Sequence, residues 1–278
     1  MQGLNSQILS ASHHLERTEI CSTWNVEDRR EKQGKAGENM KIYPVGDMAL
    51  SVDFGNVISE KVNEEVMQLE HTLQEEKIPG ILEMLPSYRA LLVRYDPAQL
   101  SYALLSEKIG KAQGEKGSGE NHSSRKIIRL IPCCYGGKYG EDLKGMEALT
   151  GLSEKEIIEI HSGTDYKIYM LGFLPGFVYL GGMDERIAAP RLDVPRVVIP
   201  AGSVGIGGKQ TGVYPIASPG GWRLIGSTPV RFYNPSAEKP ILCSAGEYIR
   251  FVPVSESSYE KIAADVAAGP YRAEIANS

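Results

Sequence analysis

The chain has 278 residues, of which 42% are hydrophobic and 23% charged, the composition of a globular protein with buried cores. Its formal net charge of −5 argues against nucleic-acid binding, because nucleic-acid-binding proteins usually present a basic surface. No apolar run reaches the roughly 18 residues of a membrane-spanning helix, and the N-terminus lacks the apolar core of a signal peptide. We therefore expect a soluble, cytoplasmic protein with neither a nucleic acid nor a membrane as partner.

The four cysteines are Cys21, Cys133, Cys134 and Cys243. The adjacent pair would be strained as a disulfide, because neighbouring side chains of an extended chain point to opposite sides. No Cys-x-x-Cys pair or Cys/His cluster has the spacing of a zinc site. We predict reduced structural thiols and no metal site.

The first 39 residues differ from the rest of the chain. They are polar, carry a charge-dense run at 27–35 and show no sustained apolar period, so we predict a disordered leader at 1–39. The pattern changes abruptly at Met40 to Lys-Ile-Tyr-Pro-Val. We hypothesise that Met40 is the native start and that the leader is a gene-calling artefact.

Residues 40–113 are predicted to form an α/β N-terminal domain. Val62, Val66, Leu69 and Leu73 recur at the spacing of one helix face. At Asp96-Pro97 a favoured N-cap residue precedes a proline that the first helical position tolerates. We predict, in chain order, a strand at 49–54, a helix at 59–76, strands at 81–85 and 89–95, and a helix from Asp96 that buries Leu100, Leu104 and Ile109.

Residues 114–125 are rich in glycine, serine and charge, and we predict a linker there. A strand at 126–131 has two possible assignments. It could complete the order βαββαβ of a ferredoxin-like sandwich. If the linker is the domain boundary, the strand belongs instead to a second domain at 126–278, which is the division that we adopt.

The second domain begins with one clear helix. Ser153 and Glu156 form a capping box, and Ser162-Gly163 ends the helix just after His161. Beyond it, short apolar runs between glycines and prolines predict an all-β barrel or sandwich. The predicted strands and final helix are 197–199, 213–216, 230–233, 248–252 and 257–267.

The stretch 169–182, YMLGFLPGFVYLGG, is the first candidate for function. Its three rings, Phe173, Phe177 and Tyr179, are interrupted by proline and glycine. This pattern favours a loop that presents aromatic faces beside accessible backbone. The alternative is a hydrophobic turn that packs inside the barrel.

The glycine-dense stretch 195–229 is the second candidate. A phosphate-binding loop ending at Lys209 would need glycine at 203 and Ser or Thr at 210, where the chain has Ser203 and Gln210. No helix follows as a dinucleotide fingerprint requires. What remains is an array of backbone donors at 202–210 that binds an anion or an amide carbonyl. The alternative is a set of tight barrel turns.

Three side chains complete the candidates. His161 lies at a predicted helix end, whose dipole would favour the protonated imidazole, so it is either an acid/base or a cap for carbonyls. Arg191 and Arg196 each follow a proline, a rigid mounting suited to carboxylate or phosphate recognition. The alternative for both is a surface ion pair.

Several segments in order resemble a known family. They are IHS at 160–162, YMLGFLPGFVYLGG, PR-x3-PR at 190–196, IPAGSVGIGGKQTGVYP at 199–215 and SPGGW-x2-IGSTP at 218–229. They resemble the family that contains the B-type subunit of bacterial 5-oxoprolinase, also known as allophanate hydrolase subunit 1 and as the sporulation kinase A inhibitor. The resemblance runs from about Met40 to Val254. It departs from the family pattern at Lys209, where a second glycine is usual, and at Ser227, where an arginine is usual.

The resemblance implies an α+β protein, with a small α/β N-terminal domain, here ferredoxin-like, followed by a cyclophilin-like β-barrel. It also implies ATP-dependent ring opening of 5-oxoproline together with a larger C-type partner subunit and a separate lactam hydrolase subunit. The cofactor would be ATP with Mg, shared with the partner.

Within that interpretation the candidate catalytic residues are His161, Arg196 and Gln210. Arg196 is expected to hold a carboxylate, and the loop that ends at Gln210 to polarise the lactam carbonyl. The candidate substrate-binding residues are Phe173, Pro175, Gly176, Phe177, Tyr179, Gly205, Gly207, Gly208, Tyr214, Pro219, Gly220, Gly221 and Trp222.

Two other functions stay open. The family also implies an inhibitor that grips a sensor histidine kinase and blocks its autophosphorylation, in which case the aromatic patch is an exposed contact surface. Prolyl isomerisation by the barrel is a third hypothesis, although fold does not transfer function.

Overall fold

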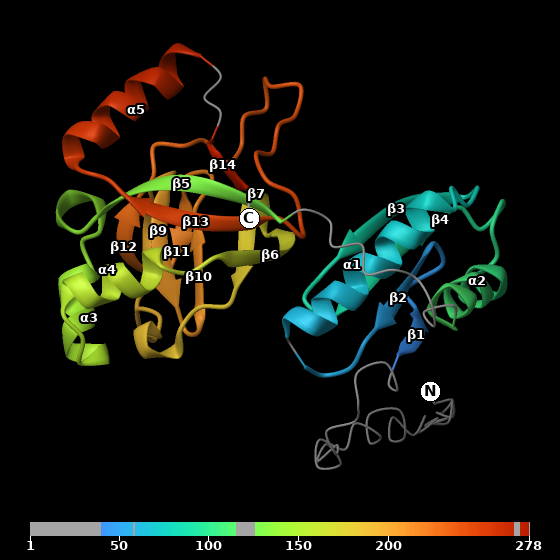
Figure 1. Ribbon diagram of the computed structural model, residues 1–278. Coiled ribbons are helices and arrows are strands. Elements are labelled where there is room, and N and C mark those ends of the chain that lie inside the picture. The colour runs from blue at the N-terminus through green and yellow to red at the C-terminus, as the bar shows by residue number, and fades with distance from the viewer. Residues whose placement is uncertain (1–39, 58, 115–125, 270–272, 278) are drawn as a thin grey trace, which may run out of the picture. The chain divides into compact units, whose positions relative to one another are not determined.

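The computed structural model describes residues 40–57, 59–114, 126–269 and 273–277. The predictions for the leader at 1–39 and for residues 115–125 of the linker lie outside these ranges. Residues Asn39–Ser278 form one compact unit with mixed α/β structure. It holds a four-stranded sheet and a nearly closed, barrel-like sheet of eight strands (Figure 1). The division into two domains at the linker stays a prediction.

The four-stranded sheet is antiparallel and has the order β1-β2-β4-β3. The predicted order βαββαβ is wrong, because the fourth strand comes from the start of the chain. A short turn in which the Val45 amide donates to the Ala49 carbonyl (2.8 Å) folds β1 back onto β2. The elements are β1 (Lys41–Pro44), β2 (Ala49–Asp53), α1 (Glu60–Glu75), β3 (Ile81–Pro86), β4 (Ala90–Tyr95) and α2 (Tyr102–Gly114).

Helix α1 follows its predicted pattern closely. Its N-cap Ser59 accepts a hydrogen bond from the Val62 amide, and the four predicted apolar positions are buried. Helix α2 begins later than predicted. The Asp96 carbonyl accepts from the amides of Gln99 and Leu100 in a separate turn, and the Ser101 hydroxyl then accepts from the Leu104 amide. This shift buries Leu105 and leaves Leu104 exposed.

The barrel-like sheet has the order β10-β9-β12-β5-β13-β6-β7, and β14 adds to β5. All pairs are antiparallel except β5 with β13. The strand predicted at 126–131 is therefore part of this sheet. The strands are β5 (Ile127–Tyr135), β6 (Tyr166–Gly172), β7 (Leu174–Gly181), β9 (Ser203–Gly207), β10 (Gln210–Val213), β12 (Arg223–Ser227), β13 (Tyr248–Pro253) and β14 (Ile275–Asn277).

A separate two-stranded ribbon pairs β8 (Arg196–Ile199) with β11 (Ser218–Gly220). The predicted strands at 197–199 and 248–252 are confirmed as β8 and β13. The run at 213–216 leaves the sheet after Val213, since Pro215 lacks the N–H that a ladder needs. The run at 230–233 makes only an isolated bridge from Tyr233 to Ile241.

The remaining helices lie in the C-terminal half of the chain (Figure 1). The predicted capping box of α4 (Glu154–Ser162) is confirmed, with Ser153 and Glu156 each satisfying the other's backbone amide. Helix α5 (Glu256–Ala268) is capped by Ser255, close to the predicted start. Helix α3 (Leu143–Thr150) and two 3-10 turns, η1 (Gly137–Tyr139) and η2 (Glu185–Ile187), were not predicted.

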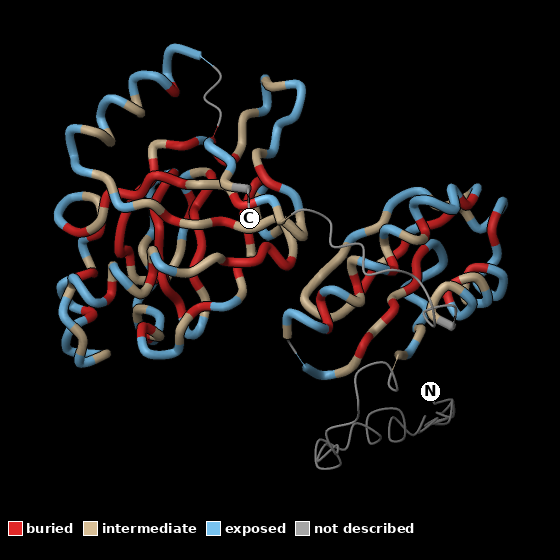
Figure 2. The backbone as a smooth tube through the Cα atoms, viewed as in Figure 1, coloured by how far each residue is buried: buried red, intermediate tan, exposed pale blue. Residues whose placement is uncertain are grey.

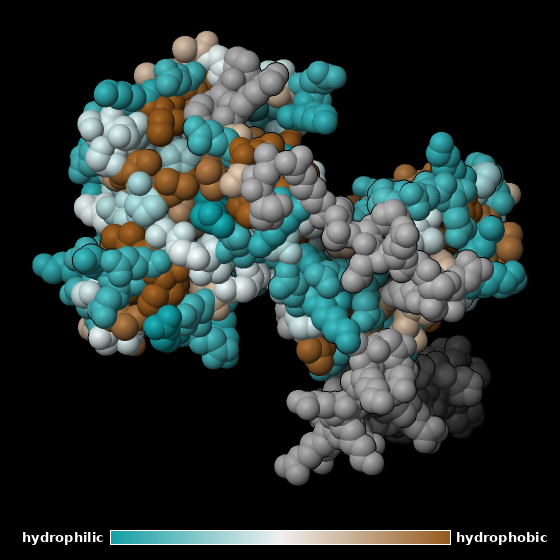
Figure 3. Space-filling view, viewed as in Figure 1, coloured by the Kyte–Doolittle hydropathy of each residue, from teal (hydrophilic) through white to brown (hydrophobic). Residues whose placement is uncertain are grey.

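In the smaller sheet the buried residues lie on β2 and β4, whereas β1 and β3 hold none (Figure 2). On the face shown in Figure 3, hydrophilic and hydrophobic side chains are interspersed. No helix in the described part of the chain is long and apolar enough to cross a bilayer. Cys133, Cys134 and Cys243 are buried free thiols, while Cys21 lies outside the described ranges. Within those ranges, no cluster of His, Cys, Asp and Glu could hold a metal ion.

Candidate functional site

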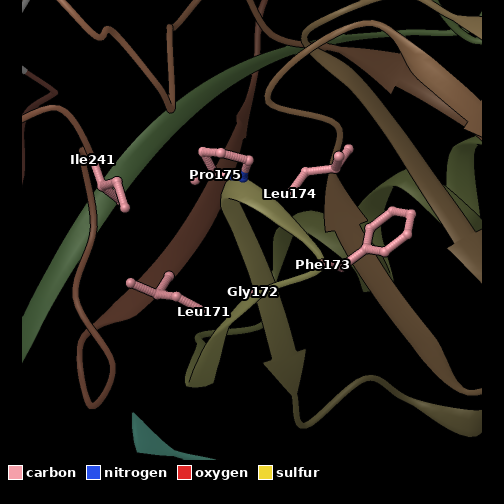
Figure 4. Close-up of a pocket in the computed structure, with 7 residues that line it drawn as sticks. Leu171, Gly172, Phe173, Leu174, Pro175 and Ile241 are labelled. Atoms are coloured by element: carbon pink, nitrogen blue, oxygen red, sulfur yellow. The ribbon is translucent and has the colours of Figure 1, made fainter. Parts of the chain in front are cut away.

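The aromatic stretch at 169–182 is a β-hairpin of β6 and β7, and the predicted loop is wrong. The chain turns at Gly172 and Phe173, whose φ angles are 152° and 62°. A positive φ is unfavourable for phenylalanine. Phe173 nevertheless occupies this turn, where it is 68% exposed. Figure 4 shows its side chain at the hairpin tip. Gly176 also has a positive φ of 80°, and a Cβ there would lie 2.8 Å from the Phe232 carbonyl oxygen. Glycine at 176 thus permits close approach of two backbone segments.

An open apolar pocket of about 320 Å³ lies at the hairpin tip (Figure 4). Its lining includes the predicted residues Phe173, Pro175 and Gly176, together with Ile241. Because no charged or polar side chain lines it, this pocket could receive an apolar group but offers no group for catalysis.

The two predicted segments meet in an aromatic cluster formed by Phe177, Ile199, Tyr214, Trp222 and Leu224. The Phe177 ring centroid lies 5.9 Å from that of Tyr214 and 5.8 Å from that of Trp222. The exposed fractions of these three side chains are only 3%, 3% and 6%. These three rings therefore pack against one another, and the neighbouring rings of Tyr179, which is half-buried, and Phe173, which is exposed, reach the surface.

The glycines of the second segment make room for the Trp222 indole. A Cβ at Gly207 would lie 2.3 Å from its Cδ1 atom, one at Gly212 would lie 3.1 Å from Cζ3, and one at Gly205 would lie 3.3 Å from Cβ. A Cβ at Gly220 would lie 2.5 Å from the Tyr214 hydroxyl. These glycines accommodate the protein's own aromatic rings.

The predicted array of free backbone donors at 202–210 is wrong, because this segment is mostly strand. Strand β9 is hydrogen-bonded to β10 on one side and to β12 on the other. The Gly202 amide donates to Tyr214 O, and the Gly208 amide donates to Ala189 O, both at 2.8 Å. Gly208, with a φ of 65°, makes the turn from β9 to β10.

His161 lies inside the barrel core and is fully buried. Its Nε2 lies 2.8 Å from the Thr211 hydroxyl, which donates to the Gly205 carbonyl at 3.1 Å, so Nε2 carries the proton. Its Nδ1 accepts from the Tyr135 hydroxyl at 2.7 Å. The expected protonated imidazole is wrong, because burial lowers the pKa of His161 to about 3. The imidazole bridges two strands and caps no helix carbonyl; a catalytic role stays a prediction.

Arg196 is held by two carboxylates. Its Nη2 lies 2.8 Å from Asp142 Oδ1, and its Nε lies 3.0 Å from Glu141 Oε1. The second oxygen of Asp142 accepts from the Leu224 amide at 2.7 Å, which ties this ion pair to β12. The guanidinium can bind a substrate carboxylate only if these contacts break.

Gln210 faces away from His161. Gln210 and Thr211 are neighbours on β10, so their side chains point to opposite faces, and Thr211 points to His161. The Gln210 amide donates to the Tyr88 hydroxyl. Burial raises the pKa of Tyr88 to about 12, so it remains a neutral phenol. The three predicted catalytic side chains therefore have separate partners.

The two departures from the family pattern have structural partners. Lys209 pairs with Glu185 on the surface at 2.6 Å. Ser227 is buried; its hydroxyl donates to the Gly202 carbonyl at 3.3 Å and lies 3.2 Å from the Tyr259 hydroxyl of α5. Position 227 thus faces a helix of the same chain.

Arg191 and Arg223 lie beside the aromatic cluster. The Arg191 guanidinium carbon lies 5.9 Å from the Trp222 ring centroid. Arg223 Nε donates to the Pro190 carbonyl at 2.9 Å, and the Leu192 amide donates to the Gly221 carbonyl at 2.7 Å. Pro219, another predicted substrate-binding residue of this region, is exposed.

Comparison with known proteins places these features in a family. A family profile described as "Carboxyltransferase domain, subdomain C and D" matches residues 40–243. The chain belongs to this carboxyltransferase-domain family. It is 43% identical to the B-type subunit of 5-oxoprolinase from Bacillus subtilis (strain 168) over 227 residues, which is 79% of this chain and 95% of that protein.

Two solved structures with a similar fold extend beyond the region that this chain matches. TTHA0988 is 34% identical, with a TM-score of 0.65 over 74% of this chain, but the match covers only 40% of TTHA0988. The K. lactis urea amidolyase has a TM-score of 0.72 over 89% of this chain and 17% of its own, at 18% identity, which shows the fold alone. Each is therefore much longer than this chain.

The glycine-rich segment does not offer the groups that would bind the phosphates of the expected ATP. A phosphate site needs free backbone amides or a cationic loop, whereas the glycine-rich segment is paired as strands and Lys209 is paired with Glu185. We therefore assign no phosphate-binding role to the glycine-rich segment at 202–210.

Several residues of this region carry no signal in the sequence. Asp142, Tyr88 and Thr211 are ordinary polar residues there, and only the fold brings them to Arg196, Gln210 and His161. Arg223 follows directly after the SPGGW motif. This position beside the motif was the one feature of the sequence that could have marked Arg223 as a candidate.

Proposed function

We propose that this chain is the B-type subunit of a 5-oxoprolinase and acts on the lactam only within a complex. The observation that carries the proposal is the 43% identity to the Bacillus subtilis B-type subunit across 95% of that protein. Hydrolysis of the lactam adds water across the amide C–N bond and yields a carboxylate and an amine. In this proposal ATP drives that step, and the reaction takes place in the cytoplasm.

The rest of the machinery resides on partner subunits in this proposal. The chain corresponds to only 40% of TTHA0988, which suggests that a separate C-type subunit supplies the part that TTHA0988 carries in one chain. The paired strands at 203–213 leave no phosphate loop in the described residues, so ATP with Mg would bind mainly to that partner. A third subunit would hydrolyse the activated lactam.

The finer fold names belong to the same proposal. The eight-stranded sheet would be a cyclophilin-like barrel. The smaller sheet would be ferredoxin-like with its fourth strand replaced by β1, since the order β2-β4-β3 with α1 between β2 and β3 matches the first three strands of that fold.

The test is reconstitution with the C-type subunit. The chain, the partner and an equimolar mixture are each assayed for ATP hydrolysis with and without 5-oxoproline. We expect 5-oxoproline-dependent hydrolysis from the mixture alone. A mixture that assembles by size-exclusion chromatography but hydrolyses no ATP in response to 5-oxoproline would reject the proposal. Dose-dependent loss of a sensor kinase's autophosphorylation would favour the inhibitor hypothesis instead.

A further inference from the structure

The backbone around Arg191 is pinned on both sides. The Pro190 carbonyl before it accepts from Arg223 Nε at 2.9 Å. The Leu192 amide after it donates to the Gly221 carbonyl at 2.7 Å. These contacts place the Arg223 guanidinium against the backbone next to Arg191, whose own guanidinium lies over the Trp222 ring. The two side chains are thus mounted on fixed backbone.

Both guanidinium groups lack a carboxylate partner within the described ranges. Arg191 contacts only an aromatic ring, and Arg223 contacts a neutral carbonyl. Arg196, which also stands near the Tyr214 hydroxyl, is neutralised by Asp142 and Glu141. The surface beside Trp222 therefore carries two uncompensated positive charges, although the whole chain has a formal net charge of −5.

Tyr179 packs against the aromatic cluster over which Arg191 lies. The half-buried Tyr179 ring packs 5.0 Å from Phe177, between centroids. Burial raises the pKa of Tyr179, and the charge of Arg191 opposes that rise, so the two side chains are electrostatic neighbours. A flat ligand with an anionic end could meet the Arg191 guanidinium and the Tyr179 ring at the edge of the aromatic cluster, with Arg223 held against the backbone next to Arg191.

We propose that Arg191 and Arg223 bind the carboxylate of a small planar acid at the edge of the Trp222 cluster, with Tyr179 beside the ligand ring. The identity of that acid as 5-oxoproline rests on the proposed function. Arg191 takes the role that the sequence assigned to Arg196. A carboxylate fits better than a phosphate, because a phosphate site usually adds free backbone amides and the neighbouring amides of Gly208 and Leu192 are already bonded.

A kinetic experiment in the assembled complex tests the role of these residues. We expect Arg191→Gln and Arg223→Gln to raise the KM for 5-oxoproline by about 10- to 100-fold, the loss of a charged hydrogen-bonded pair, with a smaller effect on kcat. Arg231→Gln, at an exposed arginine outside the cluster, is the matched control and should leave KM unchanged. An active complex whose KM is the same in Arg191→Gln as in the wild type overturns the inference while the proposed function stands.

A binding experiment on the full-length chain is independent of turnover. In a Trp24→Phe background, Trp222 is the single tryptophan and reports on its own surroundings. We expect saturable fluorescence changes with 5-oxoproline, weakened at least about tenfold by Arg191→Gln and not by Arg231→Gln. We expect none with 2-pyrrolidone, which has the lactam but no carboxylate.

Together, the kinetic and binding experiments distinguish failure of the proposed function from failure of the proposed carboxylate site. Saturable, Arg191-dependent binding of 5-oxoproline by a chain whose complex shows no turnover would reject the proposed function and support the site. Inorganic phosphate binding more tightly than 5-oxoproline would overturn the choice of a carboxylate. Absence of saturable binding to the wild-type chain, or equal binding of 2-pyrrolidone, would overturn the inference itself.

Discussion

His161 illustrates how burial decides the chemistry of a single residue. It ends a helix, where the dipole favours a cation, but the barrel core removes it from water and from any carboxylate. Desolvation wins, and the imidazole is a neutral link between Tyr135 and Thr211.

This neutral state makes stability depend on pH. The folded pKa of His161 is about 3, below the ordinary value of 6.5, so between these values the unfolded chain binds more protons and the free energy of unfolding falls as pH falls. At pH 5 the loss from this residue is about 2 kcal/mol relative to pH 7. Urea denaturation at both pH values should show that His161→Gln removes this difference, whereas the exposed His71→Gln does not. An unchanged pH dependence in His161→Gln would refute the buried neutral imidazole.

Partial burial also determines how much the ion pairs of Arg196 contribute to stability. It is partly buried between Asp142 and Glu141, so its removal leaves Asp142, whose side chain is 14% exposed, without its cation. We expect Arg196→Met to cost about 1–3 kcal/mol of unfolding free energy. Arg94→Met, which breaks an exposed pair with Glu83, should cost less than about 1 kcal/mol. Equal, small losses in both variants by denaturant titration would mean that Arg196 is free for a ligand.

At the scale of elements, the glycine-rich strands are shaped around one tryptophan. Gly207 on β9 and Gly212 on β10 lack the Cβ atoms that would strike the Trp222 indole. The cluster therefore ties β9, β10 and β12 to the β6–β7 hairpin through Phe177. The glycine-rich segment, which resembles a ligand-binding loop in sequence, here provides space for the Trp222 ring.

Substitution of Gly207 tests this packing. We expect Gly207→Ala to destabilise the fold by about 1–3 kcal/mol, because its Cβ would overlap a buried, stiff ring. Gly145→Ala in helix α3 meets nothing within 4 Å and should stabilise the fold by about 0.5–1 kcal/mol. Thermal unfolding monitored by circular dichroism distinguishes the two signs. A Gly207→Ala variant as stable as the wild type would mean that the Trp222 ring is mobile.

Local patterns in the sequence predicted some elements well. The apolar spacing of α1 and the capping box of α4 act within a few residues, so neither depends on the rest of the fold. The origin of the fourth strand of the smaller sheet was mispredicted, since strand partners lie far apart in the chain. Helix α2 started late because Asp96 caps a separate turn and Ser101 caps the helix.

The sequence predicted which segments form the candidate site, but not what their glycines and arginines do there. The hairpin and the SPGGW segment were both predicted as candidates, and the structure packs aromatic residues of both into one cluster. The sequence could not tell whether a missing Cβ makes room for a ligand or for Trp222. It assigned the carboxylate to Arg196, because the local sequences of Arg191 and Arg196 are alike and their partners differ only in the fold.

At the scale of the whole molecule, the proposed function makes this chain one part of a larger complex. Relatives such as TTHA0988 extend well beyond the region that it matches. The described residues offer an arginine pair, an aromatic cluster and an apolar pocket at the hairpin tip, but no metal cluster. This combination suits a subunit that binds an acid and leaves nucleotide chemistry to a partner.

The most direct measurement is an omission assay that follows isotopically labelled 5-oxoproline to glutamate. The complete complex, the complex without this chain and this chain alone are compared with ATP and Mg present. The account predicts glutamate from the complete complex alone. Glutamate from this chain alone, or undiminished glutamate after its omission, would contradict the account.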